Sequence, residues 1–193
     1  MQQISDWNEL RDKIHANAVE HGFWENNPSP EHFMCLVISE LMESVEAHRK
    51  DRRTDQSLLA HFNDPGDYQP GRTGFTGYFE MYVKDTVEDE LADATIRLLD
   101  LAGMIELDLS LMPSMVRLCD EQTDLSDFQS ATFTEHIFNI LREIVKLHVS
   151  DAILCSLGSI CALAGYMEID LAKHIDLKME YNNRRIHKHG KQY

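Results

Sequence analysis

The chain has few of the features that mark nucleic-acid-binding, secreted or membrane proteins. Its 18 Lys and Arg residues are outnumbered by 33 Asp and Glu residues, which gives a formal net charge of −15. Surfaces that bind nucleic acid or anionic membranes are basic, so we expect neither partner. The N-terminus has no apolar core like that of a signal peptide, and no stretch approaches the roughly eighteen apolar residues of a membrane span. These absences predict a cytoplasmic protein.

Cysteine patterns and β-strand patterns are missing as well. The four cysteines are widely spaced or six apart, without a C-x-x-C arrangement, and lie among apolar residues: Cys35, Cys119, Cys155 and Cys161. We expect reduced, buried thiols. No segment reads convincingly as a strand, so the predicted class is all-α. A length of 193 residues suits one domain, residues 1–193.

Capping residues predict where the helices begin. Ser5 is expected to cap a first helix that stops at Gly22, and Ser29 with Pro30 to open a second helix reaching about Arg52. Thr86 is expected to open a third. Further helices follow Pro113, Thr132 and Asp170, with the two after Thr132 joined at Val149 and Ser150. The segment at about 54–82 is rich in Gly, Pro and aromatic residues. This composition predicts a long loop, which is either a functional lid or an exposed insert.

Two carboxylate pairs stand out on the predicted helices, Glu40 with Glu43 and Glu90 with Asp93. Side chains three residues apart share one face of a helix, so each pair can direct its oxygens at one point. Both pairs border apolar stripes, where carboxylates are uncommon. Two such helices face to face would form a four-carboxylate cage suited to Mg2+ or Mn2+. The alternative is an ordinary solvated acidic face.

An internal repeat relates the two halves of the chain. Residues 101–109 read LAGMIELDL and residues 163–171 read LAGYMEIDL, an offset of 62 with six of nine residues identical. A weaker match pairs residues 31–33 with residues 135–137 at an offset of 104. These offsets pair the four carboxylates, in chain order, with Ile144, Leu147, Ala152 and Cys155. We therefore predict a four-helix bundle of two hairpins with flanking helices: a catalytic hairpin at about 29–109 and a degenerate structural hairpin at about 132–171.

With these motifs assembled, the chain resembles the all-α nucleoside triphosphate pyrophosphatases, which include MazG-like proteins, dimeric dUTPases and dCTP pyrophosphatases. The family pattern is Glu-Glu-x-x-Glu on one helix and Glu-x-x-Asp on a later one. Here SELME at 39–43 and ELAD at 90–93 match it, with Ser39 in place of the first Glu. The resemblance extends to the basic tail at about 173–193, which contains Lys178, Asn182, Arg185 and Lys188.

The resemblance implies hydrolysis of a nucleoside triphosphate to a monophosphate and pyrophosphate. Mg2+, or Mn2+ in its place, would be held by Glu40, Glu43, Glu90 and Asp93, with Glu40 or Glu43 as the catalytic base. The nucleotide would be bound by residues of the tail, Lys178, Asn182, Arg185 and Lys188, and Arg97 could support the carboxylates. It also implies a homodimer in which each chain holds one site.

Two other classes of protein are alternatives to this enzyme. A non-catalytic helical adaptor would carry the acidic pairs only as surface charge. A carboxylate-bridged di-iron protein needs Glu-x-x-His motifs on facing helices, and the sequence contains no such paired arrangement.

Overall fold

The computed structural model describes residues 4–55, 57, 59, 62, 74–122 and 130–185, and within these ranges it contains eight helices and no strand. The predicted all-α class is confirmed. The helices are α1 (Trp7–Glu20), α2 (Pro30–Arg49), α3 (Phe75–Tyr82), α4 (Val87–Met104), α5 (Met112–Gln122), α7 (Phe133–Lys146), α8 (Val149–Tyr166) and α9 (Leu171–Asn183).

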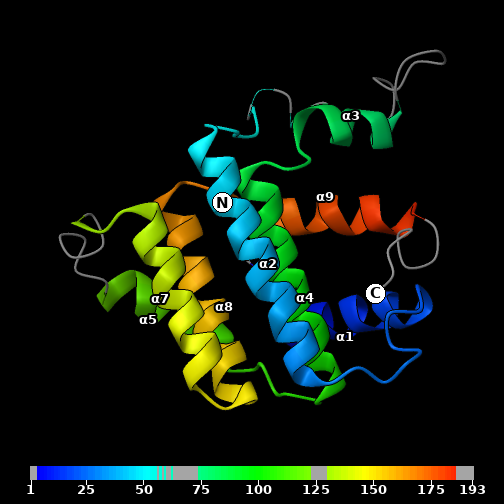
Figure 1. Cartoon of the computed structure of the whole chain (residues 1–193), viewed down its shortest axis with the longest axis vertical. Coiled ribbons are helices and arrows are strands. Elements are labelled where there is room, and N and C mark those ends of the chain that lie inside the picture. Colours follow the sequence, from blue (N-terminus) through cyan, green and yellow to red (C-terminus); the bar gives the residue numbers. More distant parts are fainter. Residues whose placement is uncertain are drawn as a thin grey trace.

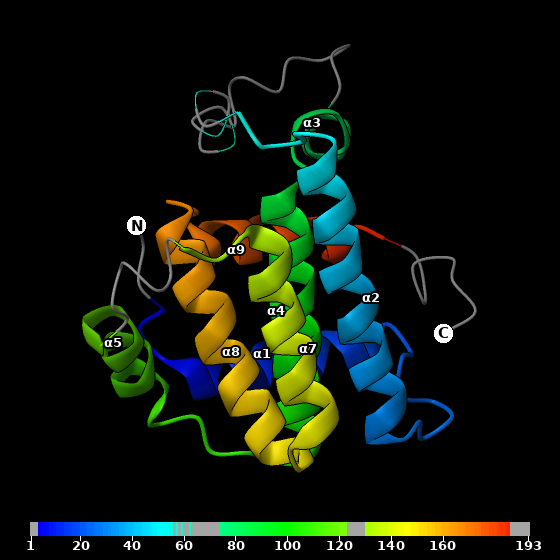
Figure 2. The same cartoon turned by 60° about the vertical axis from the view of Figure 1, so that its left-hand side comes forward.

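Four of these helices contact one another in a closed ring: α2 with α4, α4 with α8, α8 with α7, and α7 with α2. Their axes run side by side in both views (Figures 1 and 2). Helices α1 and α9 cross this group at a steep angle and contact α4 (Figure 1). Helix α4 therefore lies at the centre of the molecule, and 13 of its 18 residues are buried.

The capping residues explain most of the helix limits. Ser29 caps α2 with Pro30 as its first residue, and Thr86 caps α4, as predicted. The first helix is capped by Asp6, whose carboxylate accepts two backbone N–H groups. The prediction of Ser5 was wrong by one residue because two good capping residues lie side by side.

Helices α4 and α8 have the same length and the same end. Both contain 18 residues, and their limits differ by 62 positions, the offset of the sequence repeat. Beyond each helix a glutamate adopts a left-handed conformation, Glu106 with φ 51° and Glu168 with φ 58°. The next residue then donates its N–H to a carbonyl five residues back, at 2.9 Å and 2.8 Å. Such C-terminal turns normally favour glycine, and one of them also ends α2, where Asp51 has φ 53° and Arg52 donates its N–H to the carbonyl of Ala47. The equal lengths and limits of α4 and α8 therefore carry the argument for this register.

The register between α2 and α7 is less regular. Helix α2 has 20 residues and α7 has 14. Ile144, which the repeat pairs with Glu40, is buried, whereas Leu147, paired with Glu43, lies beyond the end of α7 and is 42% exposed. Leu147 and His148 connect α7 to α8, two residues earlier than predicted. Glu43 is exposed as well, so both pairs of positions agree in burial, and the two hairpins differ here in that α7 ends before Leu147.

Helix α3 lies within the segment predicted as a long loop. Phe79 of α3 is fully buried and stacks on Tyr181 of α9 with ring centroids 4.4 Å apart. Gly74 at the N-cap and Gly77 inside this helix of eight residues hid it from the sequence reasoning. The earlier part of the segment lies mostly outside the described residues. A small aromatic cluster thus joins α3 to α9.

Helix α8 and the thiols depart from expectation. By length and composition α8 could cross a membrane, with a mean hydropathy of 1.5, although the sequence was judged to hold no such stretch. It lies between α4 and α7 and buries eight residues. Cys35 is exposed, while Cys155 and Cys161 are half-buried, so the expectation of buried thiols was wrong for Cys35.

Gly103 allows α1 to approach α4 closely. A Cβ at this position would lie 2.4 Å from Cβ of His15 and 2.7 Å from its Cγ. We expect Gly103→Ala to lower the free energy of unfolding by about 1–3 kcal/mol, because α1 must move away. Urea denaturation measures the change. Gly74→Ala is the control, since its Cβ meets nothing within 4 Å; equal stability of both variants would contradict the close contact.

His174 is a buried, uncharged histidine of α9. Its side chain is 1% exposed, and neither ring nitrogen has a hydrogen-bond partner in the described part of the chain. Burial lowers the pKa of His174 to about 4. An unfolded histidine titrates near 6.5, so the unfolded chain takes up a proton first as the pH falls. The contribution of the uncharged His174 to the free energy of unfolding is therefore fully present above about pH 6.5 and is lost progressively towards pH 4.

We expect His174→Leu to flatten this pH dependence. Between pH 6.5 and 4 the parent should lose about 2–3 kcal/mol more stability than the variant. Denaturant unfolding at several pH values measures the difference. The exposed His148, replaced by Gln, serves as the control. Parallel pH profiles for the parent and His174→Leu would show that His174 carries no such linkage.

Candidate functional site

Three of the four predicted ligands meet where α2 packs on α4. One oxygen from each of Glu40, Glu90 and Asp93 lies within 4.8 Å of the other two. Glu40 and Glu90 are only 5% and 4% exposed, and the Asp93 side chain is 20% exposed. The cluster is therefore buried but open on the side of Asp93.

Glu43 lies outside this cluster. Its side chain is exposed and accepts a 3.4 Å hydrogen bond from Oγ of Ser39, the residue that replaces the first Glu of the family pattern. The charge of Glu43 still contributes to raising the pKa of Glu40. Glu43 thus lies at the rim of the site.

Two cations pair with the carboxylates. Lys178 of α9 is buried, and its Nζ lies 2.8 Å and 2.9 Å from the oxygens of Asp89 and 2.7 Å from Oδ2 of Asp93. Arg97 donates from Nε to Oε1 of Glu40 at 2.5 Å. Lys178 was expected to contact the nucleotide, but here it bonds carboxylates. Sequence reasoning missed Asp89 because an acidic first turn is a common feature of helices.

Burial and mutual repulsion shift the titration of the cluster. Burial, together with the charge of Asp93, raises the pKa of Glu40. Burial and the charges of Asp89 and Asp93 raise the pKa of Glu90 to about 9. Burial alone would lower the pKa of Lys178, but Asp93 and Asp89 raise it. No hydrogen bond from the described residues reaches the Glu90 carboxylate, so Glu90 is protonated at neutral pH when no cation binds.

The chemistry of these donors fits a hard divalent cation. Three carboxylate oxygens within reach of one ion are typical ligands of Mg2+ and Mn2+, which complete their coordination with water or phosphate. A bound cation would replace the proton on Glu90 and offset the repulsion among the carboxylates. The donor set does not distinguish Mg2+ from Mn2+.

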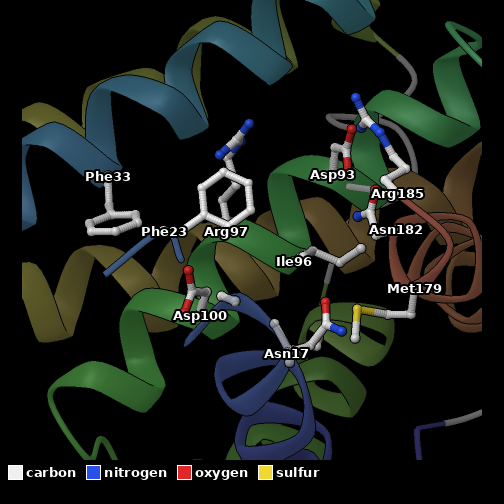
Figure 3. Close-up of a pocket in the computed structure, with 12 residues that line it drawn as sticks. Asn17, Phe23, Phe33, Asp93, Ile96, Arg97, Asp100, Met179, Asn182 and Arg185 are labelled. Carbon is white, nitrogen blue, oxygen red and sulfur yellow. The ribbon is translucent and has the colours of Figure 1, made fainter. Parts of the chain in front are cut away.

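A cavity of about 70 Å³ adjoins the open side of the cluster. Figure 3 shows Asp93, Asn182 and Arg185 at one end, Phe33, Phe23 and Asp100 at the other, and Arg97 between them. Helices α1, α4 and α9 supply most of the lining. The complete lining is Ile14, Asn17, Ala18, Phe23, Phe33, Asp93, Ile96, Arg97, Asp100, Met179, Asn182 and Arg185.

Two of the predicted nucleotide-binding residues line this cavity. Asn182 is 8% exposed, and its Oδ1 is buried without a hydrogen-bond partner among the described residues. The Arg185 guanidinium lies 5.4 Å from the ring centroid of Tyr181. Lys188, the last predicted residue of this group, lies outside the described residues.

Asp100 was missed by the sequence reasoning. It is 6% exposed, and its Oδ1 lies 2.7 Å from Nδ1 of His15 and 3.0 Å from Nε1 of Trp24. Burial raises the pKa of Asp100, and these two partners oppose the shift. The signal was present in the spacing, because Asp93, Arg97 and Asp100 occupy positions i, i+4 and i+7 of one helix face.

Comparisons of the chain with protein-family models, with curated proteins and with solved structures give no match.

We expect Glu90→Gln to stabilise the metal-free protein at pH 8. Glu90 is protonated in both states below about pH 4.5, but the unfolded chain alone releases the proton as the pH rises towards 9. Stability therefore falls across this interval, and the neutral amide removes the loss, on the order of 3 kcal/mol. Thermal unfolding in EDTA at pH 5 and pH 8 measures it. The exposed Glu43→Gln is the matched control, and an equal gain in both variants would contradict the burial of Glu90.

Proposed function

We propose that the protein is a Mg2+-dependent nucleoside triphosphate pyrophosphohydrolase, which converts an NTP or dNTP and water to the monophosphate and pyrophosphate. The observation that carries the proposal is the sharing of Asp93 between the carboxylate cluster and the cavity. A triphosphate at this junction would meet oxygen ligands for its cation, while its nucleoside would extend into the cavity, which at about 70 Å³ must widen to receive it.

At the phosphate end, Glu40, Glu90 and Asp93 would hold the cation. A bound Mg2+ would neutralise phosphate charge and lower the pKa of the attacking water. Arg97 already occupies an oxygen of Glu40. We therefore assign the role of general base to Glu43, whose exposed carboxylate at the rim is better placed to accept a proton from water.

At the nucleoside end, the lining residues offer both polar and apolar contacts. The unpartnered Oδ1 of Asn182 is an acceptor suited to a sugar hydroxyl. Arg185, also at the Asp93 end, suits phosphate oxygens because its guanidinium can donate two parallel hydrogen bonds. Phe23 and Phe33 give the opposite end apolar walls.

A second candidate is a non-catalytic helical adaptor, and the position of Lys178 favours it. Its ammonium group neutralises Asp89 and Asp93 within the chain, so the cluster can be a structural ion-pair network without a metal. The two candidates differ in their response to metal. Only the enzyme should be stabilised by millimolar Mg2+ or Mn2+ in thermal unfolding.

We expect Mg2+-dependent pyrophosphate release from at least one of the eight common NTPs and dNTPs. Asp93→Asn should lower kcat/KM at least 100-fold, because the amide keeps the size of the side chain but loses the charge that holds the cation. Glu46→Gln is the control, since Glu46 is exposed on the same helix as Glu40 and pairs with Arg49 and Lys50.

Three results would count against the enzyme. They are no release with any nucleotide, release that persists in EDTA, and an Asp93→Asn variant within a few fold of the parent. Circular dichroism of each variant confirms that the helical fold is kept. A stable protein without release and without metal stabilisation would favour the adaptor.

A further inference from the structure

One carboxylate oxygen of Asp100 is available to a ligand at the apolar end of the cavity. His15 and Trp24 both bond Oδ1, whereas Oδ2 accepts no hydrogen bond from the described residues. Asp100 lines the cavity beside Phe33 and Phe23 (Figure 3). The two partners of Oδ1 oppose the rise in the pKa of Asp100 that burial causes, and the ionised carboxylate can only accept hydrogen bonds. At this end of the cavity, Oδ2 of the ionised Asp100 can accept a hydrogen bond from a ligand but cannot donate one.

The surroundings of Asp100 hold it in one orientation. Trp24 stacks on Phe33 with ring centroids 4.0 Å apart, and the edge of His15 contacts Trp24 at 5.2 Å. Because Gly103 has no Cβ, the side chain of His15 can lie directly against α4. A carboxylate fixed by such neighbours discriminates between ligands better than a mobile one, because no rearrangement can hide its charge.

The position of Asp100 suits contact with a nucleobase. Seven residues of α-helix separate it from Asp93, which is about 10 Å along one face. If the triphosphate lies at Asp93, as the proposed function holds, and the cavity of about 70 Å³ widens around the nucleoside, the base lies near Asp100. This step rests on that placement of the nucleotide.

We propose that Asp100 selects nucleotides whose base carries an amino group on the edge remote from the sugar, namely cytosine and adenine. Cytosine N4 and adenine N6 are hydrogen-bond donors, whereas thymine O4 and guanine O6 in the same place are acceptors. An oxo base that placed its carbonyl oxygen at Oδ2 would direct lone pairs at this oxygen and leave it without a donor, which is costly. Uracil and thymine are therefore disfavoured against cytosine, and hypoxanthine against adenine. Guanine falls outside this comparison, because its N1–H and its N2 amino group are donors that suit a carboxylate.

Matched amino and oxo ligands test the proposal on the unmodified protein. Isothermal titration calorimetry with Mg2+ compares α,β-imido-dCTP with α,β-imido-dUTP, which resist cleavage between the α- and β-phosphates, and AMP with IMP. We expect the amino member of each pair to bind about 10-fold more tightly or better. A ratio below threefold in both pairs overturns the selection, whatever the variants do.

Asp100→Asn assigns the selection to this residue. The amide oxygen can still accept from His15 and Trp24, which turns the NH2 group, a donor, towards the cavity. We expect the preference to reverse towards the oxo ligands. Asp12→Asn, at an exposed position of α1, should keep the parental ratio. If Asp100→Asn does not fold, Asp100→Ser replaces it and should reduce the ratio to near one. A folded variant that keeps the parental ratio overturns the assignment.

Binding and hydrolysis separate this inference from the proposed function. Amino-selective binding without pyrophosphate release would leave Asp100 as the selective residue and reject the enzyme. Release from dCTP and dUTP at equal kcat/KM, with equal binding of the imido analogues, would reject the selection and keep the enzyme.

Discussion

The structure depends on neutralising the carboxylates that α4 carries into the interior. Glu88, Asp89, Glu90 and Asp100 are each 6% exposed or less, and Asp93 is half-buried beside them. Isolated charges are costly in such surroundings unless they are paired. Each neighbouring segment supplies a partner for this helix: Arg53 after α2 for Glu88, Lys178 of α9 for Asp89 and Asp93, and His15 of α1 for Asp100. Glu90 alone has no such partner among the described residues.

The same side-chain contacts therefore hold the helices together and form the candidate site. The hydrogen bond of His15 to Asp100 and the ion pair of Lys178 with Asp93, which link α1 and α9 to α4, also lie at the two ends of the cavity. Lys178 has a double relation to the site, because it neutralises Asp93 and competes for it with any cation bound by the cluster. Removing one partner of such a buried pair is more harmful than replacing both, since the remaining charge stays buried.

The sequence predicted what depends on local patterns. Three-residue spacing and apolar flanks identified Glu40, Glu90 and Asp93, and capping residues located the starts of α2 and α4. Glu43 fits the same pattern, but the rotation of α2 against α4 turns it outward, and spacing on one helix does not determine that rotation. Lys178 was predicted to bind the nucleotide, whereas it pairs with Asp89 and Asp93 of α4. These partners are 85 or more residues away in the chain, so no local pattern reveals them. Asp100 shares a helix face with Asp93 and Arg97, but its partners His15 and Trp24 are far from it in the sequence, and no local pattern connects them to it.

Lys178 follows its partner Asp93 by 85 residues, and this order has a consequence for biosynthesis. Ribosomes deliver α4 long before α9, so during translation Asp89 and Asp93 exist without their counter-ion. Closing the interior around them at that stage would bury uncompensated charge, which is unfavourable. The hairpin of α2 and α4 can form early, but its acidic end reaches its final burial only after α9 has been made. Helix α9 must therefore be synthesised before the acidic end of α4 can be buried together with its counter-ion.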